Sequence, residues 1–308
     1  MAADMLSLDR GRAIGFVYGC GVVALFSSFV IVSRAGYGGS LDPADLAALR
    51  FGTSGILLMP LVIRRRLLAR PLEPLVGLAL MGGLGFALLA YLGFSLAPAS
   101  HGAVMLHGTL PLTTAFLTWA TTGIRPRGGQ SSGFVLLLAG VLLVAGDGIV
   151  AVTPKLLLGD MCLLLASLCW SGYGLFVRRL GLPAIEATAA VAVVSALLFF
   201  PAYALLADSH LARAAVGDVA LQVLFQGVLI GTLSIFVFTR AVTLLGATTI
   251  SLFTAAVPAL TTAAAYVLLG EDPSRWAMLG MAIMSVGMVL ALGSLVADRA
   301  GSGGGRHE

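Results

Sequence analysis

Long apolar runs, separated by short stretches rich in charge, glycine or proline, recur along almost the whole chain. Each run approaches the roughly 20 residues that a helix needs to cross the hydrocarbon core of a bilayer. The breaks divide the sequence into ten expected spans, at about 13–33, 43–63, 75–96, 100–122, 132–151, 157–177, 185–206, 219–239, 247–269 and 275–296. The pattern therefore predicts an all-α polytopic membrane protein with ten transmembrane helices.

The composition excludes an ordinary soluble domain. Of the 308 residues, 59% are hydrophobic and 10% are charged, whereas soluble domains are about half apolar and about a quarter charged. The net charge of +4 and the pI of about 9.3 do not indicate a nucleic-acid partner, because the basic residues lie in short loops between spans. Cys20, Cys162 and Cys169 fall inside apolar runs, so we expect packing roles, with neither a metal nor a cofactor.

The distribution of basic residues predicts the orientation. The loops on the side of the N-terminus carry thirteen basic residues and the opposite loops carry four. Cytoplasmic loops are enriched in Lys and Arg, so we expect both termini in the cytoplasm, with the chain in a bacterial inner membrane. Residues 299–308 are rich in glycine and predict a flexible tail.

The two halves of the sequence repeat each other. Pro111 and Pro258 are separated by 147 residues (258 minus 111). The same offset, without a gap, also pairs Thr114 with Thr261, Trp119 with Tyr266, Gly123 with Gly270, Pro126 with Pro273, Gly133 with Gly280 and Gly140 with Gly287. At slightly shorter offsets, Gly15 pairs with Gly159, Asp45 with Glu186 and Pro60 with Pro201. We therefore expect a first five-helix repeat at 1–152 and a second at 153–298.

Repeats of five spans must enter the membrane from opposite sides, because five is odd. Inverted repeats of this kind are a recognised transporter architecture, in which the substrate site lies between the halves near the bilayer midplane. The sequence therefore predicts a central cavity between two inverted repeats.

Three segments carry a resemblance to a known family: "ADLAALRFGTSGILLMPL", "PLTTAFL" and "PALTTAAAYVLLGEDPSRWAMLGMAIMSVGMVL". Together with the repeats, they resemble the EamA family of the drug/metabolite transporter superfamily. The resemblance implies ten helices, a central cavity and transport of small solutes, commonly export of amino acids or other metabolites. It also implies a Leu-Gly-Glu turn after the fourth helix of a repeat. Leu269, Gly270 and Glu271 match this turn, whereas Thr122, Gly123 and Ile124 in the first repeat lack the acid.

Two prolines inside expected spans predict helix hinges. Pro111 leaves the carbonyl of His107 without its helical partner, and Pro258 does the same to Thr254, because proline has no N–H. Such carbonyls need a neighbouring helix, water or a cavity. We expect His107 and Thr254, which are equivalent in the repeats, to line the cavity and bind the substrate. Packing at the prolines, and a hydrogen bond from the histidine to a neighbouring helix, are the alternatives.

Aromatic residues are further candidates for substrate binding. Trp170 and Tyr173 are three residues apart and share a helix face, and Tyr91 lies within the third expected span. Their rings can stack on a substrate. A position in the aromatic belt at the membrane surface, or packing, is the alternative for each.

Arg50 is a cation within an expected span. A charge costs at least about 3 kcal/mol at the centre of a bilayer, so it must pair inside the bundle or snorkel to the surface. Because the family often has a basic residue here, we assign Arg50 a structural or gating role, as we do Glu271.

The function expected from these features is alternating-access export of small metabolites, amino acids among them, with a small-molecule substrate and the lipid bilayer as partners. A receptor or assembly subunit is the alternative, and an intramembrane enzyme is disfavoured because no HExxH, GxSxG or P-loop motif occurs. The sequence leaves open the solute, the direction of transport, coupling to protons and the oligomeric state.

Overall fold

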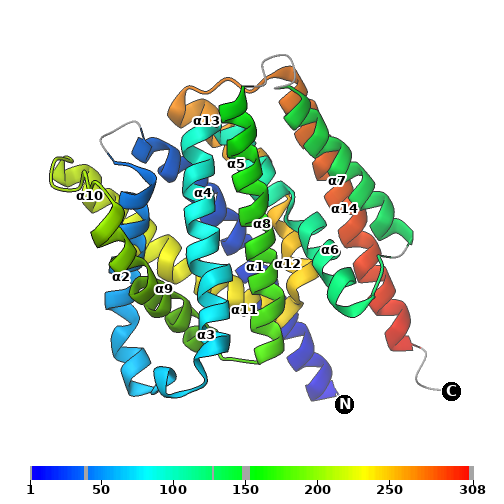
Figure 1. Ribbon diagram of the computed structural model, residues 1–308. Helices are drawn as coiled ribbons and strands as arrows, with labels where there is room; N and C mark the ends of the chain where they lie inside the picture. Colours follow the sequence, from blue (N-terminus) through cyan, green and yellow to red (C-terminus); the bar gives the residue numbers. More distant parts are fainter. Residues whose placement is uncertain (1, 38–40, 127, 148–152, 305–308) are drawn as a thin grey trace.

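A computed structural model describes residues 2–37, 41–126, 128–147 and 153–304, and this part of the chain consists of helices joined by turns and loops, without strands (Figure 1). Nine of its helices are long and apolar enough to cross a membrane. The molecule is therefore an all-α polytopic membrane protein. The expected end of the fifth span at 151 and the expected repeat boundary at 152 lie outside the described residues.

The helices follow one another with short connections. In the first half they are α1 (Ala2–Tyr37), α2 (Pro43–Arg64), α3 (Leu72–Ala79), α4 (Gly85–Leu96), α5 (Ala99–Ala103), α6 (Leu110–Thr122) and α7 (Gly128–Asp147). In the second half they are α8 (Pro154–Leu180), α9 (Ala184–Leu206), α10 (Val216–Gln222), α11 (Ile235–Leu245), α12 (Ala247–Thr254), α13 (Val257–Leu269) and α14 (Arg275–Gly304). Leu67–Ala69 form a short 3₁₀ turn. Leu80–Leu84, Val104–Gly108 and Val223–Ser234 are π-helical and continue into the neighbouring α-helices.

The expected count of ten spans is not confirmed, because nine helices among the described residues are long and apolar enough to cross a membrane and the expected span at 100–122 is not among them. The expected span at 100–122 is interrupted, because α5 passes into the π-helical turn Val104–Gly108 and a new helix, α6, begins at Leu110. Pro111 stands in the first turn of α6, where its missing N–H removes no helical hydrogen bond. Pro258 occupies the same place in the first turn of α13.

Two boundaries differ from the sequence expectation. α1 begins at Ala2, well before its apolar part, and α14 continues to Gly304. Residues 299–304, expected in a flexible tail, are therefore helical. Extending a helix that has already formed needs no new nucleation, which accounts for the longer ends.

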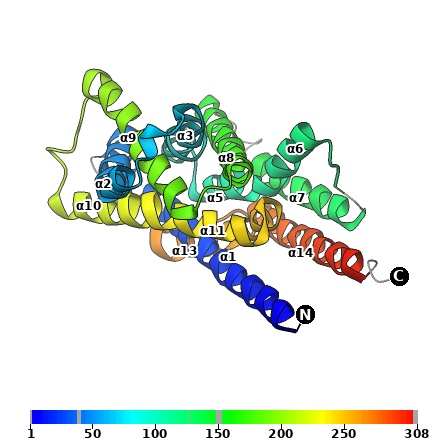
Figure 2. The same cartoon turned by 90° about the horizontal axis from the view of Figure 1, so that it is seen from below.

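α7 and α14 lie side by side in both views (Figure 1, Figure 2), and glycines bring their backbones together. A methyl group on Gly133 would lie 2.6 Å from the carbonyl oxygen of Gly287, and one on Gly140 would lie 2.5 Å from that of Gly280. The converse contacts are similarly close. A methyl group on Gly287 would lie 2.7 Å from the carbonyl oxygen of Gly133, and one on Gly280 would lie 2.7 Å from that of Gly140. Small residues allow this approach in membrane helices.

α2 packs on α9 in a similar way. A methyl group on Gly55 would lie 3.0 Å from Cβ of Ala196. α2 begins with a capping box, in which the Asp42 side chain accepts hydrogen bonds from the backbone N–H groups of Ala44 and Asp45, and the Asp45 side chain accepts one from Asp42 N. The start of α2 is thus fixed, which sets the depth of the residues further along it.

The beginning of α1 and the end of α14 lie at the same end of the bundle, at the lower right of Figure 1. The largest fully buried side chains include Trp170 and Tyr173 on α8, Arg50 on α2 and Tyr91 on α4. These buried residues belong to the candidate site.

Candidate substrate-binding site

Trp170, on α8, is the centre of a buried aromatic cluster. Its ring centroid lies 4.4 Å from that of Phe86, 4.9 Å from that of Phe238 and 5.6 Å from that of Phe26. These rings come from α4, α11 and α1, so both halves of the chain contribute. The indole N–H is buried and has no hydrogen-bond partner among the described residues. The cluster therefore combines apolar walls with an unused donor.

His107 lies at the edge of this aromatic cluster, in the π-helical turn before Pro111. Its ring centroid is 4.8 Å from that of Phe26, and neither ring nitrogen has a hydrogen-bond partner among the described residues. Leaving a buried polar group unpaired costs about 1–3 kcal/mol. The alternative that His107 simply bonds to an adjacent helix finds no support in these contacts.

Thr254 contacts the backbone beside His107. Its hydroxyl lies 2.6 Å from the carbonyl oxygen of Ser251 and 3.3 Å from that of His107, and donates to both. The carbonyl oxygen of His107 thus accepts a hydrogen bond from the second half of the chain in this conformation, instead of facing a cavity. Gly108 also allows the turn to approach Pro258, since a methyl group there would lie 3.3 Å from Cγ of Pro258.

Tyr91, on α4, donates from its hydroxyl to Oε1 of Gln226 at 2.8 Å. Gln226 in turn donates from Nε2 to Oγ of Ser33 and to Oε1 of Gln222, both at 3.1 Å. This buried chain links α4 to α1 through the π-helical segment Val223–Ser234. Gln226 was not predicted as a site residue, although an amide side chain within an apolar run indicates a buried polar contact.

Tyr173, on α8, is fully buried, so it does not belong to an aromatic belt at the membrane surface. Its hydroxyl is 2.6 Å from Oγ1 of Thr239, and its ring centroid is 5.2 Å from that of Trp170. Because this hydroxyl already has a partner, Tyr173 serves mainly as a wall of the aromatic cluster.

Arg50 lies at the opposite edge of the aromatic cluster and is 1% exposed, so it does not snorkel. Its guanidinium carbon is 5.5 Å from the ring centre of Phe86 and 5.7 Å from that of Phe29. The hydroxyl of Tyr91 is its polar neighbour and interacts with it through charge and a side-chain hydrogen bond, and no carboxylate among the described residues forms an ion pair with it. Cation–π contacts return about 0.5–2 kcal/mol each, less than the several kcal/mol that burial of an ion costs.

Hydroxyl groups join α6 to α8 next to the cluster. Thr109 donates to Ser167 at 2.9 Å, while Thr113 and Thr114 lie 2.7 and 3.0 Å from Oγ of Ser171. These groups satisfy one another, so they serve packing instead of a ligand. These hydroxyl contacts were not predicted from the sequence, because Ser and Thr are common in membrane helices.

Glu271, in the turn after α13, forms an ion pair at one end of the bundle. Its Oε1 lies 2.9 Å from Nη2 of Arg34, and its Oε2 accepts the backbone N–H of Ala99 at 2.9 Å. Arg34 also donates to the carbonyl oxygen of Phe94 at 3.0 Å. The pair therefore connects α1, the α4–α5 junction and the α13–α14 turn.

A pocket of about 410 Å³ adjoins this ion pair and is lined by Arg34, Glu271 and His101, among others. Nδ1 of His101 lies 3.1 Å from a carboxylate oxygen of Asp160 on α8. Two charged or polar pairs thus join helices at this end of the bundle.

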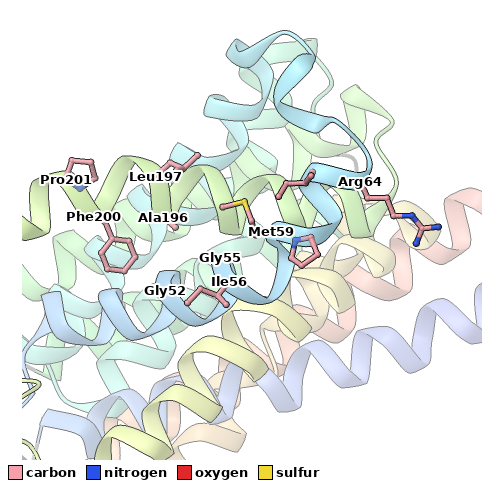
Figure 3. A pocket seen from close by; sticks show the side chains of 11 residues that line it. Gly52, Gly55, Ile56, Met59, Arg64, Ala196, Leu197, Phe200 and Pro201 are labelled. Carbon is pink, nitrogen blue, oxygen red and sulfur yellow. The ribbon is translucent and has the colours of Figure 1, made fainter.

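A larger groove, of about 1130 Å³, lies between α2 and α9 (Figure 3). Gly52, Gly55, Leu197 and Phe200 line it, and the side chain of Ile56 beside them is largely exposed. An apolar groove that opens outward on a membrane helix pair suits lipid chains, not a polar solute. The groove contains none of the residues expected to bind substrate.

The sequence model of the EamA-like transporter family matches this chain twice, at residues 13–146 and 157–293. The chain belongs to the EamA-like transporter family. Membership in EamA confirms the resemblance based on the repeated segments.

Relatives of this EamA protein are also named as transporters. It is 27% identical over 148 residues to the uncharacterized transporter YyaM of Bacillus subtilis, covering 46% of this chain and 48% of that protein. It is 27% identical over 183 residues to the uncharacterized inner membrane transporter YedA of Escherichia coli, covering 56% and 58%. The chain thus spans about half the length of the curated relatives it matches.

A solved crystal structure has the same fold. It superposes on this EamA chain with a TM-score of 0.67 at 22% sequence identity, covering 93% of this chain and 98% of the other. The helical arrangement described above is therefore one that an experimental structure also adopts.

Proposed function

We propose that the protein is an alternating-access transporter that exports small metabolites, with amino acids as the first class to test. The observation that carries the proposal is the buried cluster in which Trp170 and His107 present unpaired polar atoms between helices of both halves. In a transporter, such atoms find their partners in the solute.

The proposal treats residues 1–152 and 153–298 as inverted five-helix repeats, with the interrupted segment α5–α6 as a tenth crossing. Support comes from the contacts between α7 and α14. Gly133 meets Gly287 and Gly140 meets Gly280, which is the reciprocal pattern that a two-fold axis produces when equivalent residues are 147 apart. Gly55 and Ala196, which share the 141-residue offset of Pro60 and Pro201 (201 minus 60), likewise meet each other.

The proposed alternation involves an ion-pair gate at one end of the bundle. The Arg34–Glu271 pair closes one end of the bundle. At the equivalent turn of the first repeat, Ile124 replaces the acid, so no matching pair forms there. We assign the Glu271 gate to the outer face of a bacterial inner membrane, with both termini cytoplasmic, from the excess of arginine in the loops on the side of the termini.

The function is tested with purified protein in liposomes, measuring flux of a panel of amino acids and other small metabolites. We expect at least one solute to cross faster than in empty vesicles. Trp170→Phe and His107→Ala should lower that flux by about tenfold, because each removes a hydrogen-bonding group from the buried site. Trp119→Phe, at an exposed ring, is the matched control. Absence of flux for the whole panel would contradict the proposal.

A further inference from the structure

Arg50 is a permanent positive charge buried inside the bundle, and this fact limits what the site can bind. Arginine stays protonated in proteins, so burial cannot neutralise it. No acidic side chain among the described residues forms an ion pair with it. Asp45, on the same helix, is already used by the hydroxyls of Tyr203 and Ser209, at 2.6 and 3.2 Å.

We infer that Arg50 binds the carboxylate of the transported solute, so that the substrate class is small organic monocarboxylates with an apolar or aromatic body. This inference rests on the proposed transport function. The planar guanidinium matches the two oxygens of a carboxylate, and its buried nitrogens have the neutral hydroxyl of Tyr91 beside them but no carboxylate paired with them among the described residues.

The surroundings of Arg50 define the rest of the ligand. Phe86 lies between Arg50 and Trp170. Its ring centre is 5.5 Å from the guanidinium carbon and 4.4 Å from the ring centre of Trp170. An apolar body attached to the carboxylate would therefore meet aromatic faces. Beyond them, the free N–H of Trp170 and the imidazole of His107 are available to a second polar group of the solute.

The site holds one positive charge, which favours a single carboxylate over a dianion. If the 141-residue offset of the second helices is applied, the counterpart of Arg50 is Val191, which is buried. The second half thus supplies no matching cation at this depth.

Access to Arg50 requires movement of a covering ring. Phe86 follows the π-helical turn Leu80–Leu84, which contains Gly82 and Gly83. The side-chain stem of Arg50 rests against a second π-helical segment, since a methyl group on Gly231 would lie 3.2 Å from its Cγ. π-Helical turns in α-helices frequently mark functional sites, so these two segments are the elements that would shift when the ligand enters.

The test measures binding directly through Trp170. The chain has three tryptophans, so Trp119→Phe with Trp276→Phe leaves Trp170 as the single fluorophore. 3-Phenylpropionate and its neutral amide, 3-phenylpropionamide, are titrated against this protein in detergent. We expect the carboxylate to bind at least about tenfold more tightly than the amide, because only the carboxylate forms a charge-assisted hydrogen bond.

Variants at Arg50 then test whether this residue causes the preference for the carboxylate. Arg50→Gln should bind both probes equally, whereas Arg50→Lys should keep part of the preference for the carboxylate because it keeps the charge. Arg65→Gln, at an exposed arginine just beyond α2, is the control and should behave as the parent protein. Equal binding of the two probes to the parent protein, or a preference that survives Arg50→Gln, would overturn the inference.

The outcome is separable from that of the transport experiment. If neither probe binds while another solute of the flux panel crosses the liposome membrane, the monocarboxylate inference is wrong and the transporter proposal stands. If nothing in the panel crosses but the carboxylate binds through Arg50, the binding site stands and the transport proposal fails.

Discussion

The hydroxyl of Thr254 donates to the carbonyl oxygen of His107 across 3.3 Å, and the two residues are 147 positions apart. That separation is also the offset of the repeat. In the proposed inverted-repeat arrangement, a residue that touches its own counterpart lies at the axis relating the two halves, and the break of the α5–α6 segment would then lie at that axis.

The glycines between α7 and α14 should be needed for stability. Gly140→Val would place a branched side chain against the backbone of Gly280, and overpacking of this kind costs about 1–3 kcal/mol. We expect a lower thermal midpoint in detergent. Gly293→Val on α14, where a methyl group would meet nothing within 4 Å, should leave the midpoint unchanged. Equal midpoints for both variants would argue against close packing of the two helices.

Glu271→Gln should loosen one end of the bundle. The side chains of Arg34 and Glu271 are each 26% exposed, and pairs open to solvent contribute about 1 kcal/mol or less, so unfolding should change little. The open conformation should nevertheless gain up to about fivefold in population. In a background without Cys20, Cys162 and Cys169, maleimide should label Ser100→Cys, in the adjoining pocket, faster by that factor. The exposed Asp272→Asn is the control, and an unchanged labelling rate in Glu271→Gln would exclude a gate.

Pro111→Ala and Pro258→Ala should slow transport more than they weaken binding. Alanine supplies the N–H that proline lacks and favours a continuous helix across each break, which stiffens the element proposed to bend. We expect maximal flux to fall by at least about threefold, with little change in binding affinity, as hinge substitutions do. Pro126→Ala, in the loop after α6, should have no effect on flux. Wild-type flux in both hinge variants would mean that the breaks are only structural.

Much of this structure could be predicted from the sequence, since apolar runs and prolines act locally. The length of each run indicated the spans, and Pro111 and Pro258 marked the two interrupted helices, because a proline ring disfavours the helical conformation of the residue before it in any surroundings. The breaks also explain why the segment expected at 100–122 is not one continuous helix.

Contacts between distant segments could not be predicted in the same way. Arg34 and Glu271 are 237 residues apart, and Tyr91 and Gln226 are 135 apart, so no local pattern pairs them. Arg50 could equally have snorkelled, because whether its helix face meets lipid or the interior depends on the packing of α2 against neighbouring helices. The sequence therefore predicted which residues form the candidate site, but their contacts with one another could be seen only in the folded structure.

The orientation of equivalent loops tests the inverted arrangement most directly. Arg125 and Asp272 are exposed and 147 residues apart (272 minus 125). Each is replaced by cysteine in the cysteine-free background and treated with a membrane-impermeant maleimide in right-side-out and inside-out vesicles. The account predicts that Arg125→Cys reacts only from the cytoplasmic face and Asp272→Cys only from the opposite face. Labelling of both cysteines from the same face would contradict it.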